Sequence, residues 1–125
     1  MGTICFVILN YKTWREAAAC AESILKTQQG QDIRIVLVDN GSGNGSEESL
    51  REEFAGEKRV HVIASEKNLG FARGNNLGIR YARSHFEPDF IVAANSDIIF
   101  EQEDYCEKLR EIYKEERFDI LGGDI

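Results

Sequence analysis

Short apolar runs alternate along this chain with segments in which apolar residues recur every three or four positions. Each run has the length of one strand and ends in polar or turn-forming residues, as strands buried on both faces of a parallel sheet do. Strands are predicted at residues 4–9, 33–38, 60–64 and 90–94, with a fifth beginning at residues 120–121. Helices are predicted at residues 14–25, 47–54, 71–84 and 103–116. This alternation predicts an α/β fold, an open and mostly parallel sheet with helices on both faces.

Two helix starts carry capping signals. Thr13 is followed three residues later by Glu16, which is the pattern of a capping box. Ser46 precedes a short acidic segment and is expected to cap the helix that follows.

Length and composition fit one domain over residues 1–125. The chain is 42% hydrophobic and 30% charged, with a single proline. Its longest apolar stretch is far below the roughly 20 residues that cross a membrane. The first residues lack the basic region and cleavage site of a secretion signal, and the three cysteines are odd in number and widely spaced. These features predict a cytoplasmic chain with no membrane span and with reduced, buried thiols.

The net charge of −7 excludes electrostatic binding of nucleic acid as the main activity. An acidic chain that binds an anionic diphosphate also needs a divalent cation, Mn²⁺ or Mg²⁺, to bridge the two.

The segment from Asn68 to Gly78 is unusual for a helix because it contains Gly70, Gly74 and Gly78. An interior glycine costs about 1 kcal/mol relative to alanine, so another requirement must place them there. Either two backbones approach closely, or a ligand lies against free N–H groups at the helix start. The aspartate that ends a nearby strand favours the ligand.

Polar residues follow each predicted strand at its carboxyl end, where open parallel sheets bind ligands. These residues are Asn10, Asp39, the segment 65–70 and the run Asn95-Ser96-Asp97. Asp39 is a candidate acceptor for a nucleotide, with a loop cap as the alternative. Gly41, Gly43 and Gly45 do not match the spacing of phosphate-binding loops and favour a mobile turn.

Asp97 is the candidate metal ligand, because a strand-end carboxylate can bind Mn²⁺ or Mg²⁺ while a diphosphate completes the oxygen shell. A plain turn is the alternative for the same three residues. His61 and His85 have no Cys or His at ligand spacing and are expected to be structural or solvated.

Taken together, these motifs resemble the family 2 glycosyltransferases, inverting enzymes of the Rossmann-like GT-A fold. The resemblance spans nearly the whole chain and is strongest for bacterial rhamnosyltransferase-type members of polysaccharide biosynthesis. It implies a nucleoside-diphosphate sugar as ligand, UDP- or dTDP-linked. By this likeness Leu9, Asn10 and Asp39 contact the nucleoside, and Asn68, Gly70 and Asn76 shape the nucleotide pocket. Asn95 and Ser96 flank the nucleotide, and Asp97 holds the metal.

The chain departs from the family pattern in three places. Asn95 stands where many relatives have a first aspartate, and Gly74-Asn75-Asn76 stands where many have Ala-Arg-Asn. The acceptor half, which carries the general base, normally follows the fifth strand. The resemblance therefore predicts a single domain truncated at its C-terminal end, with no catalytic residue and little activity alone. Self-association through the open sheet edge at residues 122–125 is also expected.

Two other classes of protein stay open at this point. A non-catalytic nucleotide-binding or interaction module derived from such enzymes fits the short length. A phosphoacceptor receiver domain has a similar size, but it requires an acidic pair after the first strand, where this chain has Asn10 and Tyr11.

Overall fold

Four parallel strands form one open sheet in the computed structural model, which describes the backbone of residues 2–116 and side chains as far as residue 113. They are β1 (Ile4–Asn10), β2 (Ile33–Asn40), β3 (Val60–Ser65) and β4 (Phe90–Asn95), in the spatial order β3-β2-β1-β4. Every pairing is parallel. The predicted fold class is confirmed, and the expected fifth strand falls outside the described residues.

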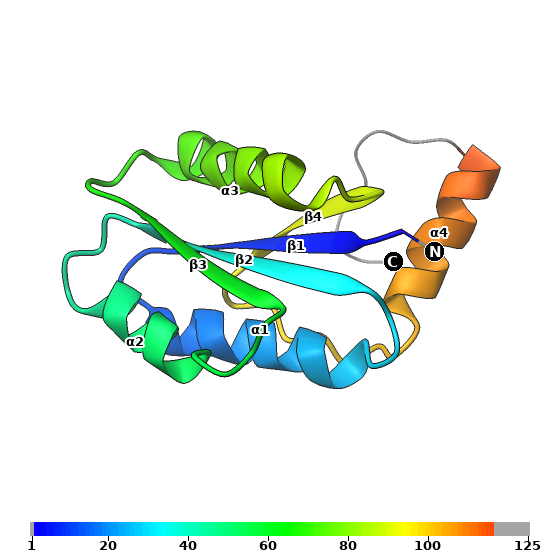
Figure 1. Ribbon diagram of the computed structural model, residues 1–125, viewed down its shortest axis with the longest axis horizontal. Helices are drawn as coiled ribbons and strands as arrows, with labels where there is room; N and C mark the ends of the chain where they lie inside the picture. Colours follow the sequence, from blue (N-terminus) through cyan, green and yellow to red (C-terminus); the bar gives the residue numbers. More distant parts are fainter. Residues whose placement is uncertain (1, 117–125) are drawn as a thin grey trace.

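Helices cover both faces of the sheet (Figure 1). α1 (Trp14–Thr27) and α2 (Ser46–Glu53) lie on one face, and α3 (Phe71–Phe86) lies on the other. α4 (Tyr105–Glu116) lies near the amino end of β1, far from the carboxyl ends of the strands. Within residues 2–116, no helix combines the length and apolar character that a membrane crossing needs.

Alternation along β1 divides the core into two clusters. Ile4, Phe6 and Ile8 are fully buried with the apolar side of α1, whereas Cys5 and Val7 are buried in the cluster under α3. This is the period-2 geometry of a strand covered on both faces, which explains why the first run has no polar residue.

Close packing of α3 on the sheet accounts for two of the three glycines in the segment 68–78. A Cβ on Gly78 would lie 2.5 Å from a methyl carbon of Val7 and 2.8 Å from one of Val38, and one on Gly74 would lie 2.7 Å from Leu9 Cδ1. Close backbone approach, rather than a ligand, therefore requires these two glycines. Gly70 differs, because its φ of +84° makes the turn that precedes α3.

Both predicted side-chain caps are wrong. Thr13 makes no capping hydrogen bond through its side chain, although α1 begins directly after it. Its own N–H donates to Asn10 Oδ1 at 3.2 Å, so Asn10 shapes this corner. Ser46 is the first residue of α2 and not its cap, and its hydroxyl donates to Asn44 Oδ1 at 2.6 Å.

Candidate functional site

The carboxyl ends of the four strands lie along one edge of the sheet (Figure 1). Register places Asn10 beside Asp39, Leu9 beside Asn95, and Asn40 beside Ser65. The structure therefore brings the predicted strand-end residues to a common edge, which is where ligands bind in open parallel sheets.

Asp39 is buried, with 4% of its surface exposed, and its carboxylate is held from one side. Oδ1 accepts hydrogen bonds from Asn10 Nδ2 at 2.9 Å and from Ser42 Oγ at 2.5 Å. Ser42 Oγ in turn accepts the N–H of Lys12 at 2.7 Å, which ties the loop after β1 to the loop after β2. Within the described part of the chain, no hydrogen bond reaches Oδ2. One carboxylate oxygen is thus committed to the protein, and the other is available to a ligand.

Asn40 organises the loop that leads into α3. Its Oδ1 accepts the N–H of Leu69 at 3.0 Å, and its Nδ2 donates to Asn68 Oδ1 at 3.1 Å and to the Gly70 carbonyl at 3.2 Å. Asn68 Oδ1 also accepts the N–H of Gly70 at 2.8 Å. The hydrogen bonds of Asn68 and Gly70 therefore build the loop.

A polar pocket of about 310 Å³ opens beside Asp39, between the loops after β2 and β3. It is lined by Asp39, Gly41, Gly43, Gly45, Ser46, Glu47, Glu48, Ser65 and Glu66. Gly41 is more than a turn residue, because a Cβ there would overlap the backbone of Lys67 and Asn68. The pocket is of a size to admit one ring system of a ligand.

A second hollow of about 420 Å³ lies between β3 and α3, lined by Ile63, Ala64, Leu77, Arg80, Tyr81 and Ser84. Although it is larger, its walls are mainly apolar and it lacks a carboxylate. We therefore place the candidate site at the smaller pocket, where polar groups from the ends of β2 and β3 converge.

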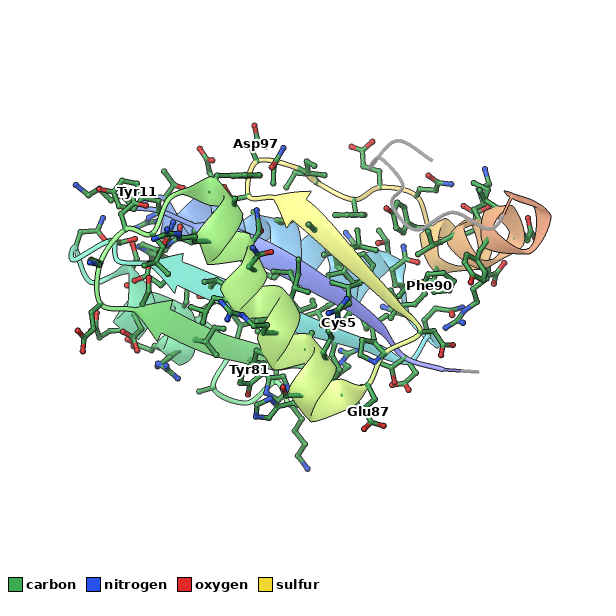
Figure 2. All side chains as sticks on the ribbon, turned by 90° about the horizontal axis from the view of Figure 1, so that it is seen from above. Cys5, Tyr11, Tyr81, Glu87, Phe90 and Asp97 are labelled. Carbon is green, nitrogen blue, oxygen red and sulfur yellow. The ribbon has the colours of Figure 1, made fainter. Side chains whose placement is uncertain are left out.

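Asp97 lies in a tight turn that directly follows β4 and points outward (Figure 2). The turn is closed by a hydrogen bond of 3.1 Å from the Ile98 N–H to the Asn95 carbonyl. Cys20 Sγ, on α1, lies 3.7 Å from the same carbonyl oxygen. Burial, and after it the negative charge of nearby Asp97, raise the pKa of Cys20 to about 12.

The chemistry of Asp97 fits one coordination position of a hard divalent cation. Among residues 2–116 no three His, Cys, Asp or Glu side chains cluster as a metal site. Mg²⁺ and similar ions commonly take only one or two protein carboxylates, with phosphate oxygens and water as the other ligands. A cation at Asp97 would therefore depend on a bound diphosphate.

Several predicted site residues make no polar side-chain contact within the described residues. Asn76 is exposed on α3, Asn95 is exposed at the end of β4, and Ser96 is half-buried. Leu9 packs where α3 approaches β1. Their predicted contacts with a nucleotide stay predictions.

Sequence reasoning did not select Asn40 and Ser42, which hold the loops and Asp39 in place. The signal was the polar run from Asp39 to Ser42. Within it, Asn40 bonds the segment 68–70, whereas Asp39 and Ser42 bond each other and the segment 10–12.

Comparison with known sequences gives one family. The model for "Glycosyl transferase family 2" matches residues 5–125. Glycosyltransferase GlyG of Streptococcus pneumoniae is 33% identical over 121 residues, which cover 97% of this chain and 38% of that protein. Low-salt glycan biosynthesis hexosyltransferase Agl10 of Haloferax volcanii is 28% identical, and the match covers 90% of this chain and 32% of that one. The chain thus spans about a third of the length of these relatives.

Solved structures share the fold. The mannosyltransferase PcManGT of Pyrobaculum calidifontis, in complex with GDP-Man and Mn²⁺, matches with a TM-score of 0.76 at 15% identity. That match covers 90% of this chain and 32% of the other. S. aureus TarS 1–349 in complex with UDP-GlcNAc matches with a TM-score of 0.74 at 16% identity, over 98% of this chain and 36% of that one.

Proposed function

The chain belongs to glycosyl transferase family 2, and from that premise we propose that it binds a nucleoside-diphosphate sugar at the carboxyl edge of its sheet. In the whole protein, the sugar would pass with inversion to a glycan or lipid-linked acceptor. The residues of this chain hold the donor, and none of them is assigned as the general base.

The half-satisfied carboxylate of Asp39 carries this proposal. Asn10 and Ser42 occupy Oδ1, which leaves Oδ2 to accept one hydrogen bond beside the pocket of about 310 Å³. Uracil and thymine present a single ring N–H between two carbonyls, which suits one free acceptor oxygen. Guanine presents two adjacent donors and would leave one of them unpaired. A UDP- or dTDP-linked sugar therefore suits the site best.

The diphosphate would lie between the start of α3 and the turn that carries Asp97. The first turn of α3 has no acidic residue and no side-chain cap, so its N–H groups and helix dipole favour an anion. Asp97 would hold Mn²⁺ or Mg²⁺, which when bound offsets negative charge on the diphosphate leaving group.

Calorimetric titration of the chain with UDP, dTDP and GDP, each with and without Mn²⁺, tests the proposal. We expect UDP or dTDP to bind more tightly with Mn²⁺, and GDP to bind roughly tenfold more weakly because one buried donor stays unpaired. Asp97→Ala should remove the gain from Mn²⁺ alone, whereas Asp39→Asn should weaken binding in both conditions. Absence of binding to all three nucleotides would refute the proposal.

A non-catalytic nucleotide-binding or interaction module is the other candidate. It predicts the same titration, but the whole protein would then release no UDP from a UDP-sugar in the presence of an acceptor. Donor turnover by the whole protein would exclude this second function.

A further inference from the structure

We propose that Cys20 and Ser23 of α1, together with Gln28 directly after this helix, are positioning residues for the turn that carries Asp97. We call these three residues the α1 anchor. This inference rests on the proposed function, because positioning of this turn affects ligand binding only if Asp97 binds the metal. It assigns a task to polar residues that face inward on a helix whose other buried residues are apolar.

Cys20 holds the amino side of the turn. It is fully buried, and its Sγ lies 3.7 Å from the Asn95 carbonyl, which also accepts the N–H of Ile98. The thiol and the turn-closing N–H thus share one acceptor. Asp97 lies between Asn95 and Ile98, the two residues that the turn-closing hydrogen bond joins.

Ser23 holds the carboxyl side of the same segment. Its Oγ accepts the N–H of Phe100 at 2.8 Å and donates to the Cys20 carbonyl at 2.7 Å. The Phe100 ring is fixed as well, because it packs edge-on against Phe6 at 5.5 Å and against Tyr105 at 5.2 Å between ring centroids. Asp97 is exposed. It lies on a short segment whose two ends are both held by α1.

Gln28 extends this attachment to the start of α4. It is fully buried, its Nε2 donates to the Gln102 carbonyl at 2.6 Å, and its Oε1 accepts the N–H of Cys106 at 3.2 Å. Both ends of the amide are used, as expected of a buried polar side chain. The segment 95–106 is thereby attached to α1 and to Gln28 directly after it at four backbone groups.

Positioning matters here because Asp97 is the only carboxylate available to the metal in this turn. A metal-binding side chain that is not held in place binds the metal more weakly. The loss of groups that orient metal ligands typically weakens metal binding by about 10- to 100-fold. Ser23 is the best residue to test, since replacing it by alanine removes one hydroxyl and leaves Asp97 and the pocket beside Asp39 untouched.

The test compares wild type, Ser23→Ala, Ser23→Thr and Ile33→Val by titration with UDP, with and without Mn²⁺. Ile33→Val is the control, because it removes one buried methyl at the far end of β2 and destabilises the fold by a comparable amount. We expect Ser23→Ala to bind UDP without metal as wild type does, while the affinity gained from Mn²⁺ falls about tenfold. Ser23→Thr should restore the gain, and Ile33→Val should not reduce it.

A measurement without nucleotide separates this inference from the proposed function. Amide ¹⁵N relaxation of Ser96, Asp97 and Ile98 should show increased motion in Ser23→Ala but not in Ile33→Val. Unchanged relaxation, or an unchanged gain from Mn²⁺, would overturn the inference while UDP binding stands. If wild type binds no nucleotide but the turn still loosens in Ser23→Ala, the proposed function fails and the anchoring of the turn stands.

Discussion

Individual side chains at the strand ends gain their roles from neighbours that are distant in sequence. Asp39 would be an ordinary turn carboxylate without Asn10, which lies 29 residues earlier and takes up one of its oxygens. Sequence reasoning found both residues because polar groups after buried strands are conspicuous. It did not find their contact, because the hydrogen bond exists only once β1 and β2 pair in register.

His61 gives a prediction about pH. Its ring lies 4.8 Å from that of Phe86, between centroids, and burial lowers its pKa, with smaller contributions from the positive charges of Arg34 and His85. In the unfolded chain its pKa returns to about 6.5, so the unfolded state binds more protons below that pH. Stability from this group is therefore present above about pH 6.5, and it is lost as the pH falls from there through the lower pKa of the folded chain.

Urea denaturation of wild type and His61→Phe, at about pH 8 and about pH 5.5, measures this effect. We expect the free energy of unfolding of wild type to fall relative to that of the variant at the lower pH. An equal difference at both pH values would contradict this account.

At the scale of elements, the apolar pattern predicts where the helices and strands lie. It does not predict the residues at which they end. The strands extend one residue beyond their predicted carboxyl ends at β1, β3 and β4, and two beyond at β2. These added residues are the polar ones that pair along the site edge. The capping motif at Thr13 failed because the side chain of Asn10 accepts the N–H of Thr13, and a local pattern cannot reveal this contact.

Gly78 gives a prediction about how α3 packs. Gly78→Ala should destabilise the fold by about 1–2 kcal/mol, since the clash with Val7 and Val38 outweighs the better helix propensity of alanine. Gly56→Ala is the matched control, because no atom lies within 4 Å of its added Cβ, and its effect should stay within about 0.5 kcal/mol. Thermal or urea unfolding of both variants measures the difference. Equal stability of the two variants would mean that α3 moves away from the sheet at little cost.

For the whole molecule, sequence alone gave a parallel sheet covered on two faces, but not its strand order. The order β3-β2-β1-β4 puts β1 in the middle, so Asn10 and Asn95 come from adjacent strands although 84 residues separate them in the chain. Likewise, the attachment of segment 95–106 to α1 and Gln28 joins residues 74 to 78 positions apart. Such contacts depend on the packing of complete layers, which no local pattern encodes.

The rate at which the three buried thiols react reports how often segments of the molecule open. Cys5, Cys20 and Cys106 are free, and burial raises their pKa values to about 12, 12 and 11, so an alkylating reagent that needs the thiolate reacts only after a segment opens. Mass spectrometry of labelling over time should find Cys5 last, because β1 is paired on both sides. Addition of UDP and Mn²⁺ should delay Cys20 more than Cys5. A bound donor would then be detected as slower labelling of Cys20.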